Sequence, residues 1–166
     1  MPTLNEINFS YETEKEYTDL QDNKIKSDKI DIYINKLKLK KIWKENDENV
    51  YFAIECKRIE QMNDTNINLY IDDIVKCTNR EHRKLRLPFE GQLAFIENQD
   101  ITHIALSNRI NEKLKSKTAI VTDAFLDYLL VNQNYQGTYL SKHKRNNQKL
   151  FSIYHLFLDY SEIVVK

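Results

Sequence analysis

The apolar positions in the first third of the chain follow the two-residue period of β-strands. Between residues 30 and 40, apolar side chains recur at every second position, with a shift near residue 35 that predicts a bulge or a break. A polar turn at 46–49 leads into residues 50–57, whose apolar start indicates a buried strand. We therefore expect these two strands to pair as a hairpin.

Three other segments carry apolar residues at helical spacing. Residues 4–21 predict an amphipathic helix with an acidic face, residues 69–79 a short helix, and residues 101–114 a third helix. The segment 88–96 begins with a proline and predicts a further helix, with a strand as the alternative. The apolar group 120–131 is compatible with a continued helix or with a short strand.

The last part of the chain predicts a second hairpin, because β-rich residues at 137–144 and 150–159 flank a polar turn. The order helix, hairpin, helices, hairpin describes an α/β (α+β) protein with a mixed central sheet flanked by helices. A chain of 166 residues can bury one substantial core, and its two glycines and two prolines form no linker. We expect a single domain over 1–166.

The composition indicates a globular chain with a very polar surface, because 41% of the residues are hydrophobic and 30% are charged. No apolar run approaches the roughly 20 residues that span a bilayer, and the amino terminus has no signal-peptide pattern. Two cysteines, Cys56 and Cys77, are too few for a disulfide framework and lack the paired spacing of a zinc site. These features predict a cytoplasmic protein that does not insert into a membrane.

Basic residues form local runs although the formal net charge is zero. A zero net charge removes the simplest electrostatic argument for nucleic-acid binding, so any attraction for phosphate must come from such runs. A charge run is more often a solvated face than a binding site. The candidates for contacts with backbone phosphates are Lys36, Lys38, Lys40, Lys142, Lys144 and Arg145.

Two charged residues end the predicted buried strand. Glu55 and Lys57 are separated by one residue, so their side chains lie on one face of the sheet, whereas Cys56 faces the other. Burying a carboxylate or an ammonium group is costly unless it is paired or bound to a metal. Asp31, on the neighbouring strand, can bring a second carboxylate close to Glu55. Two adjacent carboxylates repel each other unless a cation lies between them, and hard oxygen ligands suit Mg²⁺ or Mn²⁺.

These residues resemble the signature of a known superfamily. Asp31, followed 24 residues later by Glu55-Cys56-Lys57 on the next predicted strand, is similar to the motif of the PD-(D/E)XK, or restriction-endonuclease-like, nucleases. The proline in the name of the superfamily is absent here, since Ile30 precedes the aspartate. Tyr70 and the segments 139–145 and 154–159 look like those of small uncharacterised bacterial members of the same superfamily, and the similarity covers most of the chain. The resemblance implies a restriction-endonuclease-like core.

The resemblance also implies a catalytic role for Asp31, Glu55 and Lys57. Asp31, Glu55 and the backbone carbonyl of Cys56 would hold one or two Mg²⁺ or Mn²⁺ ions, and Lys57 would orient or help deprotonate the attacking water. The implied reaction is hydrolysis of phosphodiester bonds in nucleic acid, with DNA expected in preference to RNA. An acidic residue of the first helix would assist the metal site, and the matching positions are Glu14 and Glu16.

Other interpretations stay open. A Glu-x-Lys triplet arises by chance on the order of once in a chain so rich in these residues, so the same side chains are compatible with a structural ion pair in an inactive, nuclease-fold binding module. Alternatively, the chain acts in bacterial defence or restriction as a homodimer or as a subunit beside a partner protein that supplies target recognition. His143 and His155 suggest a second metal site or a general base, but a histidine on a strand is more often structural.

Overall fold

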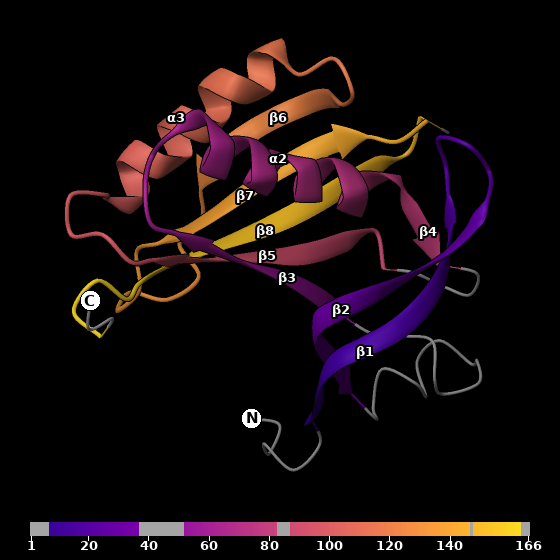
Figure 1. Cartoon of the computed structure of the whole chain (residues 1–166), viewed down its shortest axis with the longest axis horizontal. Helices are drawn as coiled ribbons and strands as arrows, with labels where there is room; N and C mark the ends of the chain where they lie inside the picture. The colour runs from indigo at the N-terminus through magenta and orange to yellow at the C-terminus, as the bar shows by residue number, and fades with distance from the viewer. Residues whose placement is uncertain (1–6, 37–51, 83–86, 147, 164–166) are drawn as a thin grey trace.

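Eight strands form one sheet in the part of the chain that the computed structural model describes, which comprises residues 7–36, 52–82, 87–146 and 148–163 (Figure 1). The strands are β1 (Ile7–Asp19), β2 (Ile25–Lys36), β3 (Phe52–Ile59), β4 (Arg80–His82), β5 (Phe89–Ile96), β6 (Val121–Tyr128), β7 (Thr138–Lys144) and β8 (Leu150–Asp159), and the helices are α2 (Asp64–Asn79) and α3 (His103–Ser116).

The sheet is mixed and has the strand order β4-β1-β2-β3-β5-β8-β7-β6. β1, β2 and β3 are antiparallel neighbours, β3, β5 and β8 run parallel, and β8, β7 and β6 are again antiparallel. α2 lies in the crossover between the parallel strands β3 and β5, as such a connection requires. The predicted pairing of the strands near residues 32 and 54 is confirmed, and so is the second hairpin, formed by β7 and β8.

Residues 7–19 form a strand, so the helix predicted over 4–21 is wrong. β1 is hydrogen-bonded to β2 along nearly its whole length. Ile7, Phe9 and Tyr11 recur at every second position, which is strand spacing, but the acids between them also suit the polar face of a helix. Pairing with a long neighbouring strand decides between two local patterns of similar strength.

Residues 89–96 form a central strand, so the helix predicted at 88–96 is wrong and the alternative strand is right. β5 lies between β3 and β8, parallel to both. A central parallel strand is buried on both faces and therefore shows a continuous apolar run instead of an alternating one. Residues 121–128 likewise form a strand, β6, in a segment where the sequence left helix and strand open.

Each helix begins at a residue whose side chain caps it. The side chain of Asn63 accepts a hydrogen bond of 3.0 Å from the Asn66 N–H, which starts α2 several residues before the predicted helix. Thr102 caps α3 in the same way through the Ala105 N–H at 3.1 Å. The end of α2 at Asn79 and the helix predicted over 101–114 are confirmed. No helix of the described ranges is long and apolar enough to cross a membrane.

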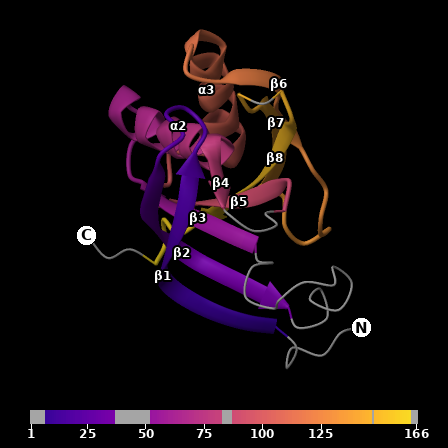
Figure 2. The same ribbon diagram turned by 90° about the vertical axis from the view of Figure 1, so that its right-hand side faces the viewer.

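Both helices cover the same face of the sheet (Figure 2). Ile67 and Ile74 of α2 and Ile110 of α3 are fully buried in one apolar cluster with side chains of β5, β7 and β8. The predicted α+β architecture, with a central mixed sheet flanked by helices, is therefore confirmed. Two sets of polar side chains interrupt the cluster, one on β3 and β5 and the other on β7 and β8.

Candidate active site

Asp31 and Glu55 lie next to each other on neighbouring strands, as the sequence predicts. The last pair of the β2–β3 ladder is Ile32 opposite Ile54, and Asp31 and Glu55 are the residues adjacent to this pair on the two strands. The Oδ2 atom of Asp31 accepts a hydrogen bond of 2.7 Å from the backbone N–H of Cys56. This bond fixes the Asp31 carboxylate at the end of the ladder, beside Glu55.

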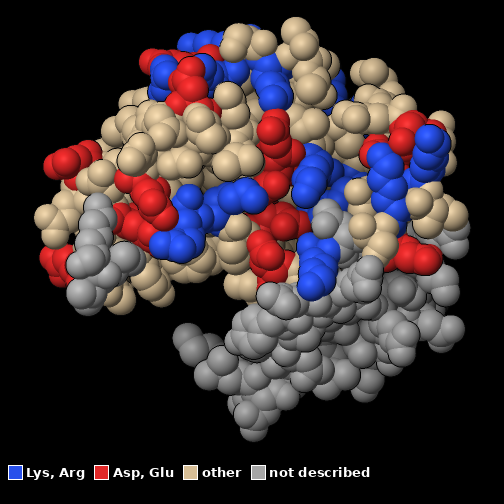
Figure 3. All heavy atoms as spheres, in the orientation of Figure 1, with Lys and Arg blue, Asp and Glu red and all other residues tan. Residues whose placement is uncertain are grey.

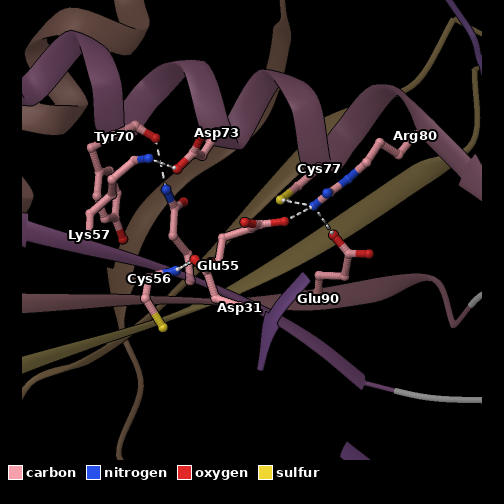
Figure 4. A network of polar contacts seen from close by, with 10 residues as sticks. Asp31, Glu55, Cys56, Lys57, Tyr70, Asp73, Cys77, Arg80 and Glu90 are labelled. Atoms are coloured by element: carbon pink, nitrogen blue, oxygen red, sulfur yellow. Dashed lines mark hydrogen bonds and ion pairs between the residues drawn. The ribbon is translucent and has the colours of Figure 1, made fainter. Parts of the chain in front are cut away.

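Glu55 and Lys57 both face α2 (Figure 4). The Nζ atom of Lys57 lies 2.8 Å from Oδ2 of Asp73, and the Nη2 atom of Arg80 lies 2.5 Å from Oε1 of Glu55. Asp73 belongs to α2, and Arg80 is the C-cap residue of the same helix. The prediction that positions 55 and 57 share one face of the sheet is therefore confirmed.

Arg80 is a buried cation enclosed by three side chains. Its side chain is 2% exposed, and Nη2 lies 3.1 Å from Sγ of Cys77 and 3.5 Å from Oε2 of Glu90, in addition to its bond with Glu55. Burial disfavours its charge, but Cys77, Glu90 and Glu55 together raise the pKa of Arg80 well above its ordinary value. A permanent positive charge thus lies one hydrogen bond away from a candidate metal ligand.

Burial and these ion pairs shift the pKa values of the two motif residues on β3. Burial raises the pKa of the Glu55 carboxyl, against the opposing effect of Arg80 and with a further rise from Asp31 and Asp73. Burial lowers the pKa of the Lys57 ammonium, but the hydrogen bond to Asp73 and the surrounding carboxylates outweigh that effect, so the net shift is upward. Lys57 is therefore positively charged at neutral pH.

Acidic and basic side chains gather around this place in the part of the chain that the structure describes. The acids are Asp31, Glu55, Asp73 and Glu90, and the cations are Lys57 and Arg80. Figure 3 shows acidic side chains in a band across the middle of this face, over α2 and the strands beneath it, with basic side chains on both sides.

The residues present fit a divalent cation between Asp31 and Glu55. Within the described ranges, no three His, Cys, Asp or Glu side chains gather closely enough to hold a metal ion, so a backbone carbonyl and water would have to complete the ligand set. The N–H and C=O groups of a strand residue point to the same neighbouring strand. Since the Cys56 N–H points to Asp31, its carbonyl points there too, beyond the last β2–β3 pair. Asp31 and Glu55 each use one oxygen in the contacts above, which leaves the other for a hard cation.

Sequence reasoning missed four polar residues that complete the site, namely Asp73, Arg80, Glu90 and Gln92. Asp73 lies on the buried stripe of α2 between Tyr70 and Cys77, and an acid on an apolar stripe was the available signal. The side chains of Glu90 and Gln92 belong to the site because residues 89–96 form the strand β5 and not the predicted helix. Nε2 of Gln92 donates a hydrogen bond of 2.8 Å to the backbone carbonyl of Tyr70. Arg80 begins a run of basic residues that continues with His82, Arg83, Lys84 and Arg86, and such a run is more often a solvated face than part of a buried site.

Glu14 and Glu16 lie on the strand β1. They were expected to assist the metal site from a helix, and residues 7–19 do not form one. Their positions in the ladder are opposite Lys29 and Ser27, nearer to the β1–β2 turn than Asp31 is. Glu16 is exposed. The structure therefore adds no support for a role of either residue in metal binding.

Lys142 and Lys144 lie away from the motif. They are exposed on β7 and alternate with Ser141 and His143, which are buried on the helix-covered face, so the two lysines face the opposite side of the sheet. β5 and β8 separate β7 from β3. The positions of Lys142 and Lys144 therefore add no support for phosphate contacts beside the motif.

Arg145 is not available to a phosphate group. It is 7% exposed, its guanidinium carbon lies 4.2 Å from the centre of the Phe151 ring, and its Nη2 donates a hydrogen bond of 3.3 Å to the Arg80 carbonyl. Its predicted contact with nucleic acid is therefore replaced by a structural role. Of the remaining predicted basic residues, Lys36 ends β2, and Lys38 and Lys40 lie outside the described residues.

His143 and His155 belong to a buried hydrogen-bonded chain. The hydroxyl of Ser141 lies 2.8 Å from Nε2 of both rings, while Nδ1 of His155 lies 2.8 Å from the Tyr70 hydroxyl and Nδ1 of His143 lies 3.2 Å from Oγ1 of Thr122. Burial lowers the pKa of His143 to about 4 and that of His155 well below its ordinary value. All four ring nitrogens have partners, which supports the structural interpretation of both histidines.

No protein-family model, curated protein or solved structure matches this chain. The likeness to the PD-(D/E)XK nucleases therefore rests on the motif residues and on how the fold brings them together.

Proposed function

We propose that this chain is a metal-dependent nuclease of the PD-(D/E)XK type, which hydrolyses phosphodiester bonds of nucleic acid with Mg²⁺ or Mn²⁺. The observation that carries the proposal is the convergence of Asp31, Glu55 and Lys57 at the end of the β2–β3 ladder. A restriction-endonuclease-like core is part of the proposal. It is supported by the mixed sheet and by the presence of the motif on two neighbouring strands.

Asp31, Glu55 and the backbone carbonyl of Cys56 would hold the divalent cation. When bound, such an ion polarises a scissile phosphate and lowers the pKa of a water molecule. Lys57 carries a positive charge beside these ligands and would orient the attacking water or offset negative charge that develops at phosphorus. Because an ammonium group has donors and no acceptor, its pairing with Asp73 favours the orienting role over proton abstraction.

The resemblance supports DNA in preference to RNA and a role in bacterial defence or restriction. A cytoplasmic location is supported by the two cysteines, which are too few for a disulfide framework. A homodimer or a complex with a partner protein that supplies target recognition is the proposed assembly.

The test is cleavage of plasmid DNA, single-stranded DNA and RNA with Mg²⁺, with Mn²⁺ and with a chelator, by the wild type and by Lys57→Ala. We expect cleavage that needs the metal and is lost in Lys57→Ala. Lys113→Ala is the matched control, because Lys113 has a similar exposure, 27% against 34%, and also pairs with an aspartate at 2.8 Å. Equal cleavage by the wild type and Lys57→Ala contradicts the proposal.

The second candidate function is an inactive binding module with a nuclease-like fold. It is favoured by the contact between Glu55 and Arg80, because a guanidinium 2.5 Å from the carboxylate already supplies the cation that Glu55 requires. In that case the wild type binds nucleic acid but cleaves none with either metal, and Lys57→Ala leaves binding unchanged. A binding measurement beside the cleavage assay therefore separates the two functions.

A further inference from the structure

We propose that Asp73 is the positioning residue for Lys57, so that α2 supplies a carboxylate that holds the ammonium group in one place beside Glu55. This inference rests on the proposed nuclease function and extends it to a residue outside the motif. Asp73 contacts Lys57 through a 2.8 Å ion pair and would touch no reacting atom itself. Its effect on the reaction would therefore pass entirely through Lys57.

The ion pair joins a buried acid to a partly open amine. The side chain of Asp73 is 8% exposed, whereas that of Lys57 is 34% exposed. Asp73 lies on the stripe of α2 that also carries Tyr70 and Cys77, both fully buried. An apolar residue at this position would usually serve stability as well or better, because a buried charge pays a desolvation cost. A role in placing Lys57 explains why an acid is present.

Two neighbouring ion pairs show how Asp73 differs from an ordinary surface partner. Lys117 lies 2.7 Å from Asp72, and Lys113 lies 2.8 Å from Asp64. The three lysines have similar exposures of 34%, 30% and 27%, but the carboxylates of Asp72 and Asp64 are 56% and 59% exposed. Exposed pairs of this kind restrain a side chain weakly. Only the acid at position 73 is itself held by the packing around it.

A lysine needs such a partner because its four-carbon stem is flexible and its ammonium is a point charge without directional preference. A misplacement of about 1 Å in a catalytic group can cost on the order of 10²-fold in rate. Arg80 follows Asp73 by seven residues, close to two turns of α-helix, and makes the corresponding contact with Glu55. One helix thus fixes both charged side chains of the Glu-x-Lys triplet.

The experiment compares steady-state cleavage by the wild type, Asp73→Asn and Asp72→Asn. We expect kcat of Asp73→Asn to fall by about 10- to 100-fold with KM nearly unchanged, because a positioning residue acts on the transition state. Asp72→Asn, one residue away on the same helix, should stay within about twofold. Asparagine has almost the same shape as aspartate, and equal melting temperatures would show that the variant is folded.

A second readout does not depend on activity. Acylation of lysine amines, followed by mass spectrometry, should show Lys57 reacting several-fold faster in Asp73→Asn than in the wild type, with Lys113 as the internal reference. In Asp72→Asn only Lys117 should react faster. Unchanged reactivity of Lys57, or wild-type kcat in an active Asp73→Asn enzyme, overturns this inference alone. A wild type that cleaves nothing overturns the proposed function together with it.

Discussion

Two buried polar networks lie under α2 on the same face of the same sheet, and they handle charge in opposite ways. The charged set consists of Asp31, Glu55, Lys57, Asp73, Arg80 and Glu90, and the histidine chain consists of Tyr70, His155, Ser141, His143 and Thr122. The charged set lies at the end of the β2–β3 ladder and keeps Lys57 partly open to solvent. In the histidine chain, Tyr70, Ser141 and both histidines are buried.

The difference between the two networks shows how a site can be told from a structural element. With both imidazoles neutral, each group of the histidine chain can donate to one neighbour and accept from the other, so the chain is complete without a ligand. In the charged set, Asp31 and Glu55 each retain a carboxylate oxygen beyond the contacts described above. A network that is complete serves the fold, whereas one that leaves carboxylate oxygens for a further ligand indicates binding or chemistry.

The largest expected effect comes from neutralising a metal ligand in the charged set. Glu55→Gln should lower metal-dependent cleavage by about 10³-fold, because a bound cation contributes several kcal/mol to the stabilisation of transition-state charge. Cleavage rates at saturating Mn²⁺ measure this effect. A rate within tenfold of the wild type would mean that Glu55 serves only as the counter-ion of Arg80.

The next largest effect is the decrease in the free energy of unfolding at low pH that the buried histidines cause. Below pH 6.5 the unfolded chain protonates His143, whereas the folded protein, with a pKa of about 4, does not. The free energy of unfolding therefore has its full value above pH 6.5. It decreases as the pH falls towards 4, by about 3 kcal/mol from His143 alone. Denaturant unfolding of the wild type and His143→Gln at pH 7, 5.5 and 4 measures the difference. Parallel pH dependences of the two proteins would contradict this account.

The smallest effect is expected from the hydroxyl that joins the two histidines. Ser141→Ala leaves two buried ring nitrogens without a partner, so the free energy of unfolding should fall by about 2 kcal/mol. Cleavage should be unchanged, because Ser141 makes no contact with the motif. Ser152→Ala, on the adjacent strand and facing the other side of the sheet, is the control. If a folded Ser141→Ala variant lost cleavage, the histidine chain would contribute to the reaction, contrary to this expectation.

The sequence predicts the motif strands better than the rest of the site. The polar turn, the apolar run before Glu55 and the alternation around Asp31 are local features, and they predict the pairing of β2 with β3. The β1 strand could not be predicted with the same success, because its alternating residues also fit an amphipathic helix. β5 was assigned as a helix because a strand buried on both faces has no alternation.

Partners that come from distant elements could not be derived from the sequence. The contact of Lys57 with Asp73 depends on how α2 crosses over β3, and the contact of Arg80 with Glu90 depends on β5 being a strand. A basic residue at position 145 predicts a solvated charge, yet the packing of Phe151 buries it. Local patterns therefore predict which residues are unusual, and tertiary packing decides what they meet.

Whether Asp31 and Glu55 share a divalent cation can be seen in a crystal soaked in Mn²⁺. We expect an anomalous peak between the two carboxylates, next to the backbone carbonyl of Cys56. A peak at another place, or no peak while Arg80 remains bound to Glu55, would contradict it.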